Sequence, residues 1–128
     1  MTLREPIYEE PVTSVMTKGV LFIEGEKNLN DAVKIIADFD VGSVLVTVNN
    51  EPAGIITTKD IVKALFKKLD FGKTKIKEIM TSPLISISSR ETISVALVKM
   101  KEKRINHLIV KDGEKIIGML NPLNLLVV

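Results

Sequence analysis

Residues suited to binding a phosphate and a sugar gather in the segment Gly54–Asp60, whose sequence is GIITTKD. Its apolar start predicts a strand and its polar end predicts a helix beginning, where backbone N–H groups and the helix dipole favour an anion. The Thr57 hydroxyl and the Lys59 ammonium add donors, and the Asp60 carboxylate can accept hydrogen bonds from the vicinal hydroxyls of a ribose. Gly54 has no Cβ, which leaves room for a flat ligand.

The same residues also fit a purely structural interpretation. Thr57 and Asp60 have the spacing of a capping box, in which the hydroxyl and the carboxylate satisfy backbone N–H groups of the helix itself. Gly54 then marks a tight strand crossing, and Lys59 is a solvated surface charge. The motif alone leaves both interpretations open.

Composition argues against an enzyme. The chain has no cysteine and a single histidine, His107, so thiolate chemistry is excluded and little remains for a histidine metal site or proton relay. We find no nucleophile–base pair, no cluster of metal ligands and no Gly-x-x-x-x-Gly-Lys phosphate loop. The sequence predicts a non-catalytic protein that requires no cofactor.

Charge and apolar patterning narrow the expected partners and location. Lys plus Arg number 18 against 16 Asp plus Glu, so the chain lacks the basic excess of a nucleic-acid binder. The lysines at 63, 67, 68, 73, 75 and 77 have no alternating aromatic residues and fit a solvated face better than a nucleic-acid surface. No apolar run approaches the length of a membrane-spanning helix, and the first residues lack the apolar stretch of a signal peptide. We therefore expect a cytoplasmic protein without a membrane partner.

An internal repeat organises the whole chain. A shift of 64 residues, half of the 128, aligns the sequence with itself without a gap, and mainly apolar positions match. The matched segments include Val15–Thr17 with Ile79–Thr81, Val44–Val46 with Leu108–Val110, and Gly54–Ile56 with Gly118–Leu120. Two copies of one fold require such a shared core pattern.

Each copy predicts the order strand, helix, strand, strand, helix. In the first copy we expect strands over 20–23, 43–48 and 53–56 with a turn at 49–52, a helix capped at Asn28 with an apolar stripe reaching Phe39, and a helix over 58–69. The inner face of that last helix is predicted to carry Ile61, Val62, Leu65 and Phe66.

The second copy predicts strands over 84–87, 107–110 and 115–120, a helix capped at Thr92, and a last helix beginning at Pro122 and reaching Val128. We assign repeat 1 to residues 1–69, a linker to 70–74 and repeat 2 to 75–128. The expected fold class is α/β (α+β), with two β-α-β-β-α repeats packed sheet against sheet around a pseudo-two-fold axis, since one copy alone buries too little surface.

The repeat makes the chain resemble a tandem pair of cystathionine β-synthase (CBS) domains, often called a Bateman module. The resemblance covers roughly residues 12–128 and rests on the two Met-Thr entries, Met16-Thr17 and Met80-Thr81, the hairpins, and the Gly-x-x-Thr-x-x-Asp motif ending at Asp60. It implies a regulatory module that binds an adenine nucleotide or S-adenosylmethionine in clefts between the copies, forms homodimers through its helices and acts on another protein.

By that resemblance Thr57 contacts phosphate and Asp60 contacts the ribose of a first site, with Lys59 nearby. The residues implied to line its adenine slot are Thr17, Gly19, Val20, Val41 and Gly42. Asn106 and His107 occupy the position where the family often places basic residues; the alternative for His107 is a strand-edge histidine with no ligand role.

The second copy departs from the motif, because Asn121 and Asn124 replace the threonine and the aspartate. A neutral amide makes weaker hydrogen bonds to hydroxyls than a carboxylate does, and Pro122 removes one backbone donor. A weaker second site is therefore expected, with Thr81, Pro83, Leu84 and Ile105 forming its apolar slot. The alternative to a sensor is an interaction scaffold in which the clefts no longer bind a ligand.

Overall fold

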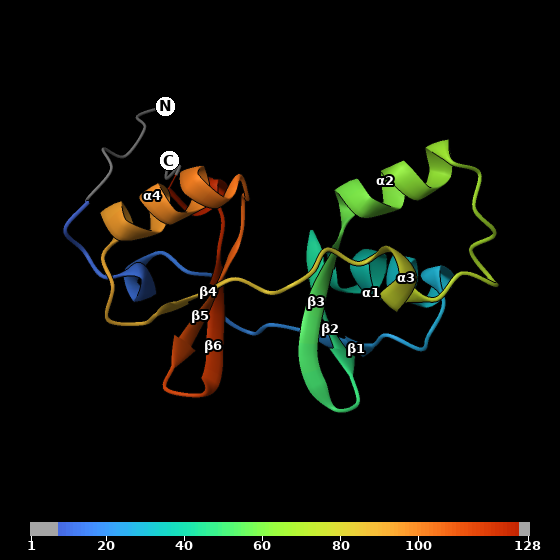
Figure 1. Ribbon diagram of the computed structural model, residues 1–128, viewed down its shortest axis with the longest axis horizontal. Coiled ribbons are helices and arrows are strands. Elements are labelled where there is room, and N and C mark those ends of the chain that lie inside the picture. The colour runs from blue at the N-terminus through green and yellow to red at the C-terminus, as the bar shows by residue number, and fades with distance from the viewer. Residues whose placement is uncertain (1–7, 126–128) are drawn as a thin grey trace. The chain divides into compact units, whose positions relative to one another are not determined.

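The computed structural model describes residues 8–125, which form two three-stranded sheets of identical topology (Figure 1). In the first, β1 (Phe22–Glu24) runs parallel to β2 (Ser43–Val48), and β2 pairs antiparallel with β3 (Glu51–Thr57). In the second, β4 (Ser86–Ser88), β5 (Leu108–Asp112) and β6 (Lys115–Leu120) repeat the same arrangement. The predicted α+β class and its strand order are confirmed.

Helices connect the strands. The chain forms η1 (Val12–Ser14), α1 (Leu29–Phe39), α2 (Thr58–Phe66), α3 (Ile76–Ile79), α4 (Ile93–Lys103) and η2 (Pro122–Leu125). Residues 126–128, to which the sequence extended the last helix, lie outside the described residues. Within residues 8–125 no helix combines the length and the apolar character that crossing a bilayer requires.

Contacts divide the chain into two units that do not follow the order of the repeats. The central unit comprises Leu21–Leu84, and the terminal unit comprises residues 8–20 together with 85–125. The segment before each repeat's first strand therefore belongs to the unit of the other repeat's sheet. The end of repeat 1 at residue 69 and the start of repeat 2 at residue 75 stay predictions from the sequence.

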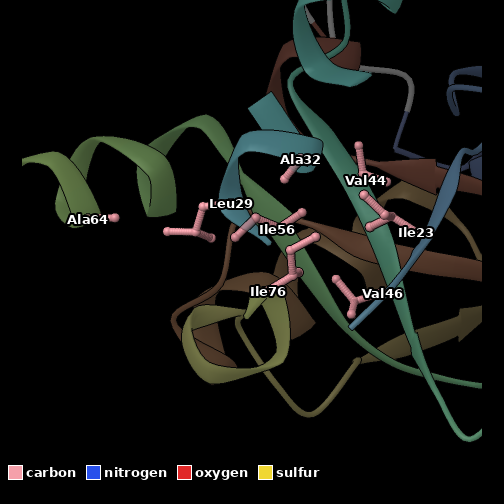
Figure 2. Close-up of a cluster of buried hydrophobic side chains, with 8 residues drawn as sticks. All are labelled: Ile23, Leu29, Ala32, Val44, Val46, Ile56, Ala64 and Ile76. Carbon is pink, nitrogen blue, oxygen red and sulfur yellow. The ribbon is translucent and has the colours of Figure 1, made fainter. Parts of the chain in front are cut away.

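The core of the central unit is aliphatic, as the composition predicts. Side chains from the sheet and from the three helices of this unit meet in one cluster, consisting of Ile23, Leu29, Ala32, Val44, Val46, Ile56, Ala64 and Ile76 (Figure 2). Val44 and Val46 alternate along β2 and so point to the same face of the sheet. Eight buried aliphatic side chains without a polar group fix the sheet, and with it the beginning of α2.

Helix α1 forms where its cap predicts. The Asn28 side chain accepts a hydrogen bond from the Asp31 N–H at 3.0 Å, and the Asp31 carboxylate accepts one from the Asn28 N–H at 3.1 Å. This reciprocal capping box satisfies two N–H groups at the first turn. The helix ends at Asp40, whose φ of 51° is left-handed.

The predicted inner face of α2 is wrong in three of its four residues. Val62, Leu65 and Phe66 are 49%, 60% and 84% exposed. Instead Ile61 and Ala64 face the core. Five of the six residues from 61 to 66 are apolar, so periodicity could not separate the buried stripe from the exposed one. The helix also ends three residues before the predicted Leu69, because Lys68 adopts a left-handed φ of 55°.

Strand ends also differ from the predictions. β1 and β4 begin two residues later than expected, at Phe22 and Ser86, while β3 begins at Glu51 and so shortens the predicted turn. Element boundaries are set by pairing with neighbouring strands, which a local apolar pattern does not contain. Phe39 is another difference, because its side chain is 62% exposed at the end of a stripe expected to be buried.

In each unit, a short extended segment crosses the third strand of the sheet, β3 or β6, at a glycine. In the central unit the Ile55 N–H donates to the Thr81 carbonyl at 2.9 Å, and the Thr81 N–H donates to the Ile55 carbonyl at 2.8 Å. A Cβ added to Gly54 would lie 2.6 Å from the Met80 sulfur and 2.8 Å from the Thr81 carbonyl. Met16 and Thr17 cross Gly118 in the terminal unit with the same contacts. The crossing, rather than a flat ligand, explains the glycine.

We expect Gly54→Ala to destabilise the protein by about 1–3 kcal/mol, because the methyl group forces either the Thr81 backbone or Met80 to move. The measurement is urea unfolding followed by circular dichroism. Gly42→Ala is the matched control, since a Cβ at Gly42 meets nothing within 4 Å. Equal stability of the two variants would contradict the crossing.

An exposed ion-pair cluster holds the segment before this crossing. The Glu26 carboxylate pairs with the Lys75 ammonium at 2.7 Å and with the Lys77 ammonium. The Ile76 N–H donates to the Lys27 carbonyl at 2.8 Å, and the Lys77 N–H donates to the Gly25 carbonyl at 3.0 Å. These backbone hydrogen bonds support the same contact. The two lysines lower the pKa of Glu26 from 4.5 to about 2.

This shift predicts an acid-dependent loss of stability. Because the folded pKa of Glu26 lies below its ordinary value, the ion pairs stabilise the protein above pH 4.5, and this contribution disappears as the pH falls towards 2. Wild-type protein is therefore expected to exceed Glu26→Gln in unfolding free energy at pH 7, with the difference vanishing near pH 2. A pH-independent difference in urea titrations would contradict this assignment.

Candidate functional site

The amino terminus of α2 carries the polar cluster that the sequence singled out. Asp60 accepts hydrogen bonds on one carboxylate oxygen from the Thr57 N–H at 2.9 Å and from the Thr57 hydroxyl at 3.0 Å. In return the Thr57 hydroxyl oxygen accepts a bond from the Asp60 N–H at 3.2 Å. The capping-box interpretation is therefore confirmed. It fixes the carboxylate in position at the helix beginning without excluding a ligand.

Thr81 completes this cluster from a distant part of the sequence. Its hydroxyl lies 3.2 Å from one Asp60 carboxylate oxygen and 3.4 Å from the other. The Gly54 crossing places it there, because the Thr81 backbone pairs with Ile55 in the strand that leads into α2. Thr57 and Asp60 are half-buried, whereas Thr81 is exposed. The cluster thus presents one carboxylate and two hydroxyls at the surface of the central unit.

Gly42 borders the same helix beginning. Its carbonyl accepts a hydrogen bond from the Thr58 N–H at 3.1 Å, and the next residue, Ser43, pairs with Thr57. Gly42 is exposed, and the space where its side chain would lie is open. Val41 beside it packs partly against the core. An apolar and a side-chain-free position therefore flank the Thr57–Asp60–Thr81 group.

The terminal unit contains a neutral version of this arrangement. Asn124 accepts a hydrogen bond from the Asn121 N–H at 2.7 Å, and its amide donates to the Thr17 hydroxyl at 3.0 Å. Asn121 in turn accepts from the Leu123 N–H at 2.9 Å. Asn124 thus occupies the capping position of Asp60, and Thr17 occupies that of Thr81. No formal charge is present in this trio.

His107 lies at the strand edge that carries the Asn trio, and Ile105 and Asn106 precede it in the chain. Leu108 pairs with Leu120, so His107 precedes one strand at the edge where Asn121 follows the other. His107 Nδ1 lies 3.4 Å from the Asn106 side-chain oxygen, and the ring is half-buried.

The structure distributes the predicted site residues over both units, and the two predicted sites stay predictions. The sequence combined Thr17 with Asp60 and Thr81 with the Asn pair, whereas the hydrogen bonds join Thr81 to Asp60 and Thr17 to Asn124. The central unit contains Val41, Gly42, Thr57, Lys59, Asp60, Thr81, Pro83 and Leu84. The terminal unit contains Thr17, Gly19, Val20, Ile105, Asn106, His107, Asn121 and Asn124.

The difference has a clear physical origin. The sequence predicts each repeat as a contiguous unit, whereas each Met-Thr segment pairs with a strand of the other repeat. Met16 and Met80, which cover the two glycines, were absent from the predicted sites. Their identical spacing in both copies was the available signal.

Comparison with known proteins identifies the fold. A family model described as CBS domain matches residues 12–67 and 76–127. The chain belongs to the CBS domain family. The predicted tandem pair is therefore confirmed.

Curated and solved relatives of the CBS pair agree with this assignment. The Methanocaldococcus jannaschii protein MJ0450 is 33% identical over 122 residues, which span 92% of this chain and 65% of that protein. A conserved Pyrococcus horikoshii protein of known structure is 28% identical, with a TM-score of 0.83 over 92% of this chain and 90% of the other. The chain thus spans somewhat less than two thirds of the curated relative.

Two further CBS structures share the fold at lower identity and contain ligands. PAE2072 from Pyrobaculum aerophilum, complexed with AMP, is 19% identical with a TM-score of 0.79 over 90% of this chain and 89% of that protein. The CBS pair of MJ0100, in complex with 5′-methylthioadenosine and S-adenosyl-L-methionine, is 24% identical with a TM-score of 0.76 over 90% and 95% of the chains.

The neutral trio suggests a conservative test of Asp60. We expect Asp60→Asn to retain the cap of α2, because Asn124 already performs that role in the terminal unit. Asp60→Ala leaves the Thr57 N–H without its acceptor and is expected to cost about 0.5–2 kcal/mol. Urea unfolding of both variants checks this, and an Asn variant as unstable as the Ala variant would contradict it.

Proposed function

We propose that this CBS pair is a regulatory module that binds an adenine nucleotide (AMP, ADP or ATP) and transmits its occupancy through self-association or a partner protein. The observation that carries the proposal is the Thr57–Asp60–Thr81 cluster beside the open position at Gly42. AMP and adenosyl compounds in CBS proteins of the same fold support the ligand class.

The carboxylate provides the chemistry for a ribose. The Asp60 carboxylate is the acceptor at the centre of the cluster, and the bonds from Thr81, at 3.2 and 3.4 Å, are the longest that it accepts. A ligand with two vicinal hydroxyls can replace this contact with charge-assisted hydrogen bonds, which are stronger than bonds between neutral groups. Thr81 is exposed and can turn towards the ligand.

The helix amides provide fewer phosphate donors than the sequence suggests. The Thr58 N–H already donates to Gly42, and the Asp60 N–H donates to Thr57. Among the first three amides of α2, the Lys59 N–H is therefore the one left for a phosphate, together with the exposed Lys59 ammonium. One amide and one cation fit a monophosphate better than they fit a cationic sulfonium, which favours AMP over S-adenosylmethionine.

The terminal unit is proposed to be the weaker site. Asn124 offers a neutral oxygen that is already bonded to the Asn121 N–H, and the helix that begins there is a four-residue 3-10 turn with proline at its first position. A short helix has a weak dipole, and proline has no N–H. Leu123 stands at the position of Lys59, so the cation is missing, and the Leu123 N–H already donates to Asn121.

Isothermal titration with AMP, ADP, ATP, S-adenosylmethionine and 5′-methylthioadenosine tests the proposal. We expect AMP to bind the wild type, and Asp60→Asn to weaken it by about tenfold, since a charge-assisted bond becomes a neutral one without loss of the cap. Gly42→Leu is expected to abolish binding by filling the open position while leaving the circular dichroism spectrum unchanged.

The exchange Asn124→Asp is the matched control. It gives the terminal unit a carboxylate at the position that corresponds to Asp60, and it is expected to strengthen nucleotide binding at that second site. No heat with any of the five ligands would overturn the proposal and favour the scaffold interpretation. Undiminished AMP binding by both Asp60→Asn and Gly42→Leu would locate the ligand elsewhere.

A further inference from the structure

The sulfur atoms of this chain are all methionine thioethers. The sequence contains five methionines and no cysteine, so a mild oxidant meets thioethers without a competing thiol. Within residues 8–125, four methionines differ in accessibility: Met16 and Met80 are half-buried, whereas Met100 and Met119 are 5% and 8% exposed. The two accessible methionines are the ones that cover the glycines of the two crossings.

Met80 packs closely against the third strand of the central unit. A Cβ added to Gly54 would lie 2.6 Å from the Met80 sulfur and 2.9 Å from its Cγ. The thioether therefore occupies the space that a side chain at this position would need. Met80 also packs against the aliphatic core cluster of the unit. Its side chain thus fills an apolar space beside the strand.

A sulfoxide does not suit that space. Oxidation turns a flexible apolar side chain into a larger polar one, whose oxygen needs a hydrogen-bond donor when it is buried. The adjoining core cluster consists of aliphatic side chains, which donate no hydrogen bond. The Ile55 and Thr81 N–H groups of the crossing already donate to each other's carbonyls. The new oxygen is hydrated only when Met80 moves away from Gly54 towards solvent.

This movement is coupled to the polar cluster through one peptide bond. Met80 precedes Thr81, whose backbone pairs with Ile55 and whose hydroxyl donates to the Asp60 carboxylate at 3.2 and 3.4 Å. When Met80 leaves Gly54, these contacts lose the packing that fixes them. The strand that leads into α2 loses its crossing partner at the same time. Oxidation of one sulfur therefore displaces a hydroxyl of the candidate site and loosens its carboxylate.

Met16 has the same arrangement in the terminal unit. A Cβ added to Gly118 would lie 2.6 Å from the Met16 sulfur, and Met16 packs partly against the core of that unit. The next residue, Thr17, pairs with Met119 through its backbone, and its hydroxyl accepts a hydrogen bond from the Asn124 amide at 3.0 Å. Each polar cluster therefore adjoins a thioether of its own.

We propose that Met80 and Met16 are reversible oxidation sites through which a peroxide lowers both the ligand affinity and the stability of the protein. The sulfur lone pair attacks one oxygen of hydrogen peroxide, an S–O bond forms as the O–O bond breaks, and the second oxygen leaves as water with both protons. The thioether loses two electrons and the peroxide gains them. A dithiol reductase reverses the step and forms a disulfide and water. The effect on affinity rests on the proposed function, whereas the effect on stability does not.

Peptide mass spectrometry after brief treatment with hydrogen peroxide tests the selectivity. In the folded protein we expect Met16 and Met80 to form sulfoxide about tenfold faster than Met100 and Met119, because burial excludes the oxidant. In protein unfolded by urea, the four rates are expected to be equal. Equal rates in the folded protein would overturn the inference.

Leucine variants separate the two sites. Leucine has a similar volume and no oxidisable sulfur, and such exchanges are the ones that packed surroundings tolerate best. In Met16→Leu, which keeps Met80, peroxide is expected to weaken AMP binding about tenfold in isothermal titration. Methionine sulfoxide reductases specific for the two epimers are expected to restore it. Met80→Leu is the matched control and is expected to keep its AMP affinity after the same treatment.

Urea unfolding provides a readout that does not depend on AMP. Peroxide is expected to lower the unfolding midpoint of the wild type and of Met16→Leu, and the reductases are expected to restore both. The double variant Met16→Leu with Met80→Leu is expected to keep its midpoint, because Met100 and Met119 stay protected. If untreated protein gives no heat with AMP, the proposed function fails and this midpoint alone decides the inference.

The inference is refuted if oxidised Met16→Leu keeps its unfolding midpoint, if Met80→Leu loses as much AMP affinity as Met16→Leu, or if the reductases do not reverse the losses. Circular dichroism checks that the untreated variants fold. Where a leucine variant does not fold, oxidation and enzymatic reduction of the wild type give the same comparison.

Discussion

The backbone crossing at Gly54 is the constraint on which the arrangement of the central unit depends. Gly54 permits Met80 and the Thr81 carbonyl to approach at distances that no Cβ tolerates. The two hydrogen bonds between Ile55 and Thr81 then fix the strand that leads into α2. Since Asp60 lies one turn into that helix, the crossing also determines which hydroxyl meets the carboxylate. The same contacts recur at Gly118.

Structural and functional interpretations of the polar cluster turn out to be compatible. The capping box uses the Thr57 and Asp60 side chains to satisfy backbone groups of α2. Because these bonds hold the carboxylate in position, they would preorganise it for the proposed nucleotide at little further entropic cost. The Thr81 contact is longer and more exposed. A ligand would displace this contact while the cap remains.

Divergence between the two copies separates their chemistry while the sheet topology stays the same. Asp60 and Asn124 both cap a helix beginning, yet one provides a charge and the other does not. Asp40 and Arg104 both end a helix in a left-handed conformation, yet with opposite charges. The cores tolerate this divergence because their buried residues are all aliphatic or methionine and include none of these four positions. Surface charge, rather than fold, therefore distinguishes the functions available to the two units.

The sequence by itself determined the repeat, the α+β class, the helix caps at Asn28, Thr57 and Thr92, and the motif ending at Asp60, because these features are encoded in local spacing. Tertiary structure decided that Thr81 bonds to Asp60, since strand pairing between distant segments leaves no local pattern. It also decided that α2 buries Ile61 and Ala64 and exposes Phe66. Several sides of that helix are apolar, so only the neighbouring core could select the buried one.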